Sequence, residues 1–167
     1  MHFRSPGRGF LTLYALAYAG LFVSFIPYVS VLLPLKVASV AEPGSRVALL
    51  STAALGGSVV ASLANLLFGA LSDGSYRRTG SRRVWVITGL VLLLPAYALL
   101  HGSASIPALL GAVALLQIAI NMMFAAVTAV MADEVPDARK GLVAGLLGAA
   151  HPFASLVAVA TTLHWLG

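Results

Sequence analysis

Long runs of apolar residues, separated by short polar connections, make up most of the chain. A helix needs about 20 apolar residues to cross the roughly 30 Å hydrocarbon core of a bilayer. Runs near that length predict five transmembrane helices, at residues 10–35, 47–71, 84–100, 106–131 and 142–164. The pattern therefore predicts an all-α, polytopic membrane bundle that forms one transmembrane domain over residues 1–167.

The composition agrees with a chain that lies in a bilayer. Hydrophobic side chains make up 60% of the residues and charged ones only 9%, whereas soluble domains carry about a quarter charged residues. The chain has no cysteine, which excludes disulfides and thiolate metal sites. No nucleophile with a base, metal-ligand cluster or phosphate loop stands out, so we predict neither an enzyme nor a bound cofactor or metal.

Basic residues alternate between the two sides of the predicted bundle. One side carries Arg4, Arg8, Arg77, Arg78, Arg82, Arg83, Arg139 and Lys140, and the other carries Lys36 and Arg46. Short cytoplasmic loops are enriched in Lys and Arg, so we expect a cytoplasmic N-terminus in a multi-pass protein of the cell membrane. The net charge of +5 then reflects orientation and contacts with membrane lipids, not nucleic-acid binding.

The most specific motif follows the second predicted helix, where the chain reads GALSDGSYRRTGSRR from Gly69 to Arg83. A small residue ends the helix, an acid follows one turn later, and basic residues open the next helix. This motif resembles the signature of the major facilitator superfamily, and its Leu-Ser-Asp form is most similar to the sugar and glycoside cation symporter branch. The matching positions are Gly69, Asp73, Arg77, Gly80, Arg82 and Arg83.

The resemblance implies that Asp73 bridges to a helix end in the opposite half of the transporter. The residues alone leave a second interpretation equally open, in which Asp73 caps a helix or pairs with Arg77, because surface ion pairs contribute only about 0–1 kcal/mol. The arginines of this segment are expected to set the orientation and contact lipid headgroups.

A second segment, from Asp133 to Gly141, resembles the same branch's connection between helices four and five. Pro136 is expected to break the fourth helix and Asp137 to cap the fifth. Two departures from the family accompany these matches: Gly74 stands where an arginine is usual, and the sequence ends after the fifth helix, whereas the family has two six-helix halves.

His151 is the titratable side chain expected deepest inside a predicted helix. Ionisable groups within a membrane are candidates for function, and a histidine changes charge near neutral pH, which suits proton coupling. The alternative is a neutral histidine, hydrogen-bonded beside the turn that Pro152 weakens. Ser155 lies on the same helical face.

Two further groups are candidates for contact with a polar solute. Gln117 and Asn121 carry amides that both donate and accept hydrogen bonds, and they either bind hydroxyl groups or hold helices together. Tyr14 and Tyr18 share an aromatic face that either stacks on sugar rings or packs and anchors the helix.

The resemblance implies transport by alternating access between two halves. We therefore expect a half-size or truncated secondary transporter for a small polar solute, which works as a parallel homodimer or with a partner half. The dimer contact is expected along a stripe of small and polar residues, Ser51, Ser58, Ser62, Asn65 and Gly69. A non-transporting membrane scaffold, or a fragment of a full-length transporter, is the alternative.

Overall fold

Helices account for the predicted apolar runs in the computed structural model, which describes residues 8–166. In chain order the elements are α1 (Arg8–Pro27), η1 (Tyr28–Leu32), α2 (Leu33–Val40), η2 (Pro43–Ser45), α3 (Arg46–Thr79), α4 (Arg83–Gly102), α5 (Ile106–Glu134), α6 (Asp137–Gly148) and α7 (Ala150–Leu166). Here η1 is a π-helix and η2 a 3₁₀-helix. No strand occurs among the described residues.

These elements form five helical stretches that are long and apolar enough to cross a membrane. They are Gly9–Val40, Pro43–Thr79, Arg83–Gly102, Ile106–Glu134 and Asp137–Leu163. The predicted all-α bundle of five spans is therefore confirmed, and the chain is a multi-pass membrane protein. The basic residue Arg4, used above to orient the chain, lies outside the described residues.

The helices group into two compact units. Unit 1 holds the chain up to Val31 and from Val127 onward, and unit 2 holds Leu32–Ala126. Both η1 and α5 contribute residues to each unit. The expectation of one transmembrane domain stays a prediction.

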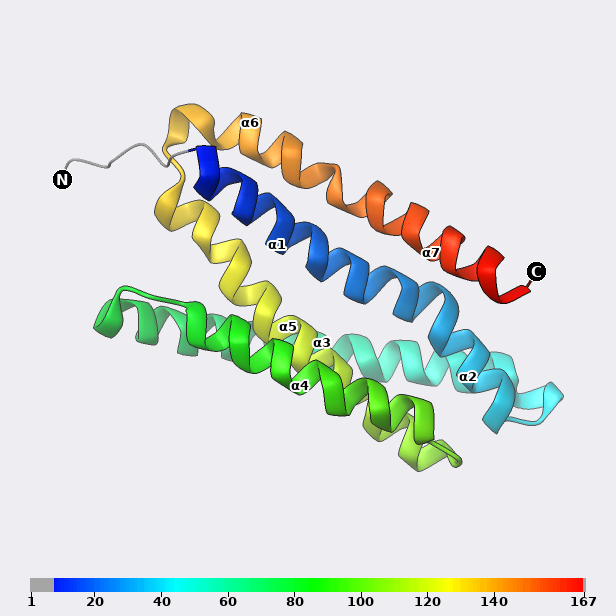
Figure 1. The fold of residues 1–167 in the computed structure, drawn as a ribbon. Coiled ribbons are helices and arrows are strands. Elements are labelled where there is room, and N and C mark those ends of the chain that lie inside the picture. The colour runs from blue at the N-terminus through cyan, green and yellow to red at the C-terminus, as the bar shows by residue number, and fades with distance from the viewer. Residues whose placement is uncertain (1–7, 167) are drawn as a thin grey trace. The chain divides into compact units, whose positions relative to one another are not determined.

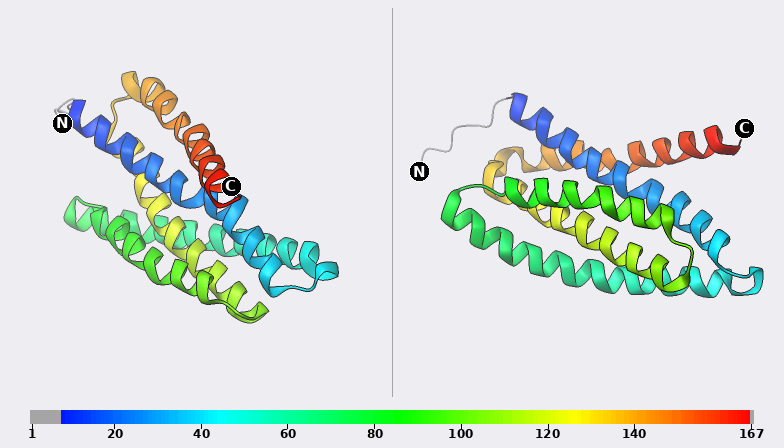
Figure 2. Two further views of the ribbon diagram at one scale, coloured as in Figure 1. Left: turned by 45° about the vertical axis from the view of Figure 1, so that its right-hand side comes forward. Right: turned by 60° about the horizontal axis from the view of Figure 1, so that its bottom comes forward.

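In unit 2, the first part of α5 packs closely against both α3 and α4. The right view of Figure 2 shows the three helices side by side. A methyl group added to Gly57 would lie 3.2 Å from a side-chain carbon of Val113. One added to Gly89 would lie 2.8 Å from the carbonyl oxygen of Ala119 and nearer still to the side chain of Met123. Glycine at both positions lets the helix backbones approach closely, as small residues do in membranes.

The face of α3 that is buried differs from the predicted stripe. Ala53, Gly57 and Ala64 are buried, whereas Ser58 and Ser62 are exposed. The hydroxyl of Ser58 donates to the carbonyl of Ala54 and that of Ser62 to the carbonyl of Ser58. Both hydroxyls are thus satisfied within their own helix, and this face does not need a polar partner.

In unit 1, α1 runs alongside α7, with α6 near the start of α1 (Figure 1). One face of α7 is buried, at Ala150, Ala154 and Ala158, and these residues recur at the four-residue spacing of a helix face. The hydroxyl of Tyr14 donates to the carbonyl oxygen of Val127 over 3.1 Å. Small residues and the Tyr14 hydrogen bond therefore help to hold unit 1 together.

Proline interrupts the first and last spans. Pro27 ends α1, the π-helix η1 follows, and Pro34 opens α2. In the last span α6 ends at Gly148 and α7 begins at Ala150, two residues before Pro152. A proline removes an N–H donor and its ring crowds the preceding turn, so each interruption lies where the regular hydrogen-bond ladder cannot continue.

Two helix ends differ from the prediction. Helix α3 continues past Leu71 to Thr79, so most of the predicted signature loop is helical. It stops at Gly80, whose φ of 68° is left-handed and whose N–H donates to the carbonyl of Tyr76, an arrangement that favours glycine. The expected cap at Asp137 is also wrong: Asp137 is the first residue of α6, makes no capping bond, and instead pairs with Lys140 at 2.7 Å.

Candidate transport site and signature segment

The signature segment is organised around one arginine in unit 2. The guanidinium of Arg82 donates to the carboxylate of Asp73 over 2.7 Å and to the hydroxyl of Ser72 over 2.8 Å. It also lies over the ring of Tyr76, 4.8 Å from the ring centre. Because α3 extends to Thr79 and the chain turns at Gly80, Arg82 reaches back to the last turns of α3.

The charges of this cluster differ in burial. The Arg82 side chain is 7% exposed and the Asp73 side chain 58% exposed, and Ser72 is fully buried. An arginine this buried needs its partners, because an uncompensated buried charge is costly. Arg82 is therefore a structural cation and not the lipid-headgroup contact that the sequence suggested, and the carboxylate of Asp73 bonds to Arg82 instead of to Arg77.

The other signature positions lie around this cluster without joining it. Arg77 and Arg83 are exposed, and Gly69 is half-buried with open space beside its Cα. Gly74, which replaces the family's usual arginine, lies inside α3 with open space around it. The segment thus combines one buried arginine, paired with a more exposed aspartate, with arginines that are exposed.

The two candidate amides meet in the core of unit 2. The side-chain N–H₂ of Asn121 donates to the carbonyl of Gln117 over 2.9 Å and lies 3.4 Å from the Gln117 amide oxygen. Gln117 is buried and its amide nitrogen faces Gly57. This geometry matches the helix-packing interpretation of Gln117, one of the two that the sequence left open.

An aromatic row follows one face of α1 in unit 1. The rings of Tyr14, Tyr18 and Phe22 contact one another in turn, at 6.4 Å and 5.3 Å between centroids. The Phe22 ring then meets the His151 ring edge-on at 5.8 Å. The structure thus brings three of the predicted residues, Tyr14, Tyr18 and His151, into one row, with Ser155 one turn further along α7.

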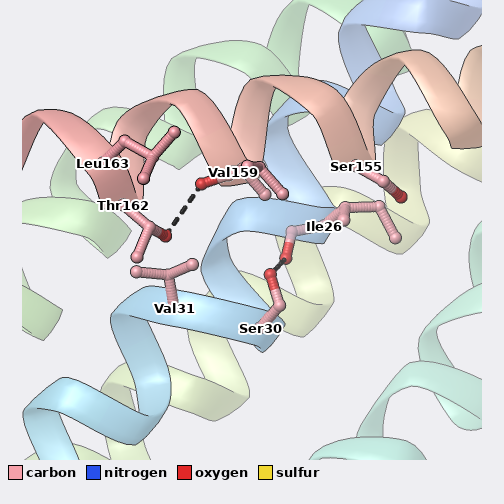
Figure 3. Close-up of a pocket in the computed structure, with 8 residues that line it drawn as sticks. Ile26, Ser30, Val31, Ser155, Val159, Thr162 and Leu163 are labelled. Carbon is pink, nitrogen blue, oxygen red and sulfur yellow. Dashed lines mark hydrogen bonds between the residues drawn. The ribbon is translucent and has the colours of Figure 1, made fainter.

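Beside this row, α1, η1 and α7 enclose a crevice of about 340 Å³ (Figure 3). Three hydroxyls belong to its lining: Ser30 from η1, and Ser155 and Thr162 from α7. Each donates to the backbone carbonyl four residues earlier in the chain, at 2.7, 3.0 and 2.9 Å in that order. Their oxygen lone pairs therefore remain able to accept hydrogen bonds from a bound molecule.

Sequence reasoning missed Ser30, because its relevance depends on the π-helix and on how α7 lies against α1. It also missed Ser72 and Tyr76, although their four-residue spacing places them on one face of α3. Within the described part of the chain no cluster of three or more possible metal ligands occurs.

Five helices long and apolar enough to cross a membrane, a signature ion pair with a buried arginine, and a largely apolar crevice between helices fit a transporter-type membrane protein. The sequence model of the Major Facilitator Superfamily matches residues 10–166, and the chain belongs to that family. Members of this family are transporters and not enzymes, which fits the lack of a recognisable catalytic motif. Neither the curated proteins nor the solved structures gave a match.

Proposed function

We propose that the chain contributes to a secondary transporter for a small polar solute. The observation that carries this proposal is the family match over residues 10–166, since it covers all five spans. Transporters of this class bind their solute near the middle of the membrane and expose it to each side in turn. The crevice between α1, η1 and α7 is the feature of unit 1 that suits such a solute.

The solute we propose is a sugar or glycoside, in line with the branch that the signature resembles. The crevice offers hydroxyl oxygens as acceptors against an otherwise apolar wall that includes Ile26 and Val159. A sugar presents hydroxyl donors along its edge and apolar C–H faces, which suit these acceptors and this wall. We assign Gln117 and Asn121 to helix packing in unit 2 and not to the solute site.

A pair of threonines on α7 allows a matched test of this site. Thr161 and Thr162 both donate to the carbonyl of Ala158, at 2.7 and 2.9 Å, but only Thr162 lines the crevice. We expect Thr162→Val to weaken uptake of radiolabelled methyl glycosides into proteoliposomes about fivefold, as loss of one hydrogen bond of about 1 kcal/mol would. Thr161→Val should leave uptake unchanged. Equal effects of the two changes would remove the crevice from the solute site.

We propose that His151 couples proton movement to uptake. The ring of Phe22 meets its edge, and an aromatic ring can stabilise an imidazolium ion. His151→Gln should then abolish the dependence of uptake on a proton gradient while leaving uptake down the solute gradient intact. If the gradient still drives uptake in this variant, His151 serves packing alone.

The proposed orientation, with the N-terminus in the cytoplasm of the cell, is open to direct labelling. The chain lacks native cysteines, so single cysteines report cleanly. Arg83 and Glu42 are both exposed and lie at opposite ends of the unit 2 helices. An impermeant thiol reagent should label Glu42→Cys in intact cells and Arg83→Cys only after lysis. The reverse result would invert the orientation.

For a two-sided transport site, we propose that the chain works with a second set of helices, either another copy of itself or a separate half. The exposed face of α3 at Ser58 and Ser62 is our proposed contact for a parallel dimer. Ser58→Trp should convert a cross-linkable dimer into a monomer in mild detergent, and Leu63→Trp, on an exposed position of α3 outside the stripe, should not. A wild-type chain that is monomeric in lipid would leave a separate half as the partner.

A further inference from the structure

A second groove lies in unit 2, apart from the signature segment. It has a volume of about 410 Å³ and is lined by Leu32, Leu35, Lys36, Ser39, Tyr97, Leu100 and His101. The first four follow one face of η1 and α2, and the last three follow one face of α4, with spacings of three or four residues. The groove therefore runs along two neighbouring helices.

Lys36 places a positive charge at one end of this groove. Its ammonium group donates to the carbonyl of His101 over 2.6 Å. His101 lies in the last turn of α4, where carbonyl groups lack helical partners. An ammonium group has three N–H donors, so two remain for another acceptor.

The leucines that η1 and α2 contribute to the groove are accessible. Leu32 is 43% exposed and Leu35 57% exposed, and both lie in the span Gly9–Val40. Lys36 itself lies about 6 Å along the helix from Val40, within reach of the polar headgroup region for a long side chain that extends toward water. An apolar track that ends in a cation at the membrane boundary matches the chemistry of an anionic phospholipid.

We propose that this groove binds an anionic phospholipid. The phosphate accepts hydrogen bonds from Lys36, with the hydroxyl of Ser39 beside it, and one acyl chain lies along Leu32, Leu35 and Leu100. A free anion would use only the charged end and leave the apolar track empty. A neutral lipid would leave Lys36 with the His101 carbonyl alone.

Native mass spectrometry of the whole purified chain, with phosphatidylglycerol and phosphatidylcholine added in equal amounts, tests the charged end. The wild type should retain phosphatidylglycerol in preference to phosphatidylcholine. Lys36→Gln should lower the retained phosphatidylglycerol about fivefold, the change expected for one basic residue near an anionic surface at about 1 kcal/mol. The matched control is Arg46→Gln, since Arg46 donates to the carbonyl of Ala41 and does not line the groove; it should change retention less than about twofold.

The apolar track has its own test, which does not alter charge or the Lys36 contact. Leu35→Trp should fill the groove and displace the lipid, while Leu99→Trp, on an exposed position of α4 outside the groove, should not. Equal loss in Lys36→Gln and Arg46→Gln, or equal retention of the two lipids by the wild type, would overturn the proposal. So would displacement of the lipid by millimolar inorganic phosphate, because the site would then recognise the free anion.

Discussion

The helices of unit 2 and those of unit 1 have similar compositions but pack by different means. In unit 2, Gly57 and Gly89 bring α3 and α4 against α5 until a single added methyl group would crowd its neighbours. In unit 1, α1 and α7 leave a crevice of about 340 Å³ between them. Small residues permit close approach of helix backbones, whereas α1 and α7 of unit 1 separate beside the π-helix that follows Pro27.

Among the five spans, the one formed by α5 has the largest buried share. The most apolar part of Ile106–Glu134 is 56% buried, twice the 28% of the corresponding part of Asp137–Leu163. Helix α5 is therefore the element on which a change of volume should cost the most. The α1–α7 contact should tolerate change, which suits helices that bind and release a solute.

Gly89→Ala should have the largest effect and tests the tight packing directly. The new methyl group would lie 2.8 Å from the carbonyl oxygen of Ala119, a backbone atom that cannot rotate away. Overpacking of this kind costs about 1–3 kcal/mol, and we expect a loss near the upper end in reversible unfolding in detergent. Gly56→Ala is the control: nothing lies within 4 Å of its added carbon, so it should not destabilise. Similar midpoints for both variants would mean that α4 and α5 are not closely packed.

Arg82→Gln comes second, because it removes a buried cation together with its partners' contacts. Asp73 is more than half exposed and regains water, but Ser72 is left buried with one bond fewer. We expect the free energy of unfolding to fall by about 2 kcal/mol. The neighbouring Arg83→Gln, which alters the same charge at an exposed position, should change it by less than about 0.5 kcal/mol. A drop of equal size in both would indicate a general charge effect instead of the Asp73–Arg82 contact.

The sequence predicted the spans well and the contacts between them poorly. Apolar runs near 20 residues can satisfy their backbone in lipid only as helices, so the five spans follow from length alone. Two faces of α3 carry small residues, however, at Ser58 and Ser62 and at Ala53 and Gly57, and periodicity cannot tell which of them meets α5. The partner of Asp73 was equally hidden, because Arg82 reaches it only after the helix has continued to Thr79 and turned at Gly80.

Two glycines of the signature segment should respond to alanine with opposite signs. Gly80 has a φ of 68°, which costs a residue with a Cβ about 1–2 kcal/mol; Gly80→Ala should lower the free energy of unfolding by about 1 kcal/mol. Gly74 lies inside α3 in open space, where alanine is the better helix former by about 1 kcal/mol, so Gly74→Ala should raise it. Thermal unfolding of the two variants tests this prediction. Lower stability of both variants would mean that the last turns of α3 are not helical.

The smallest effect is expected from Tyr14→Phe, which addresses the hydrogen bond of unit 1. The hydroxyl of Tyr14 donates to the carbonyl of Val127 over 3.1 Å, but that carbonyl lies inside α5 and also accepts the N–H of its own helical turn. When the Tyr14 hydroxyl is removed, the Val127 carbonyl therefore keeps a hydrogen-bond donor. The ring contact with Tyr18 also persists. Side-chain hydrogen bonds between membrane helices average about 0.6 kcal/mol, and we expect a loss of that size in the free energy of unfolding. A loss as large as that of Gly89→Ala would contradict the contrast between the two units, because unit 1 would then depend on one bond as strongly as unit 2 depends on close packing.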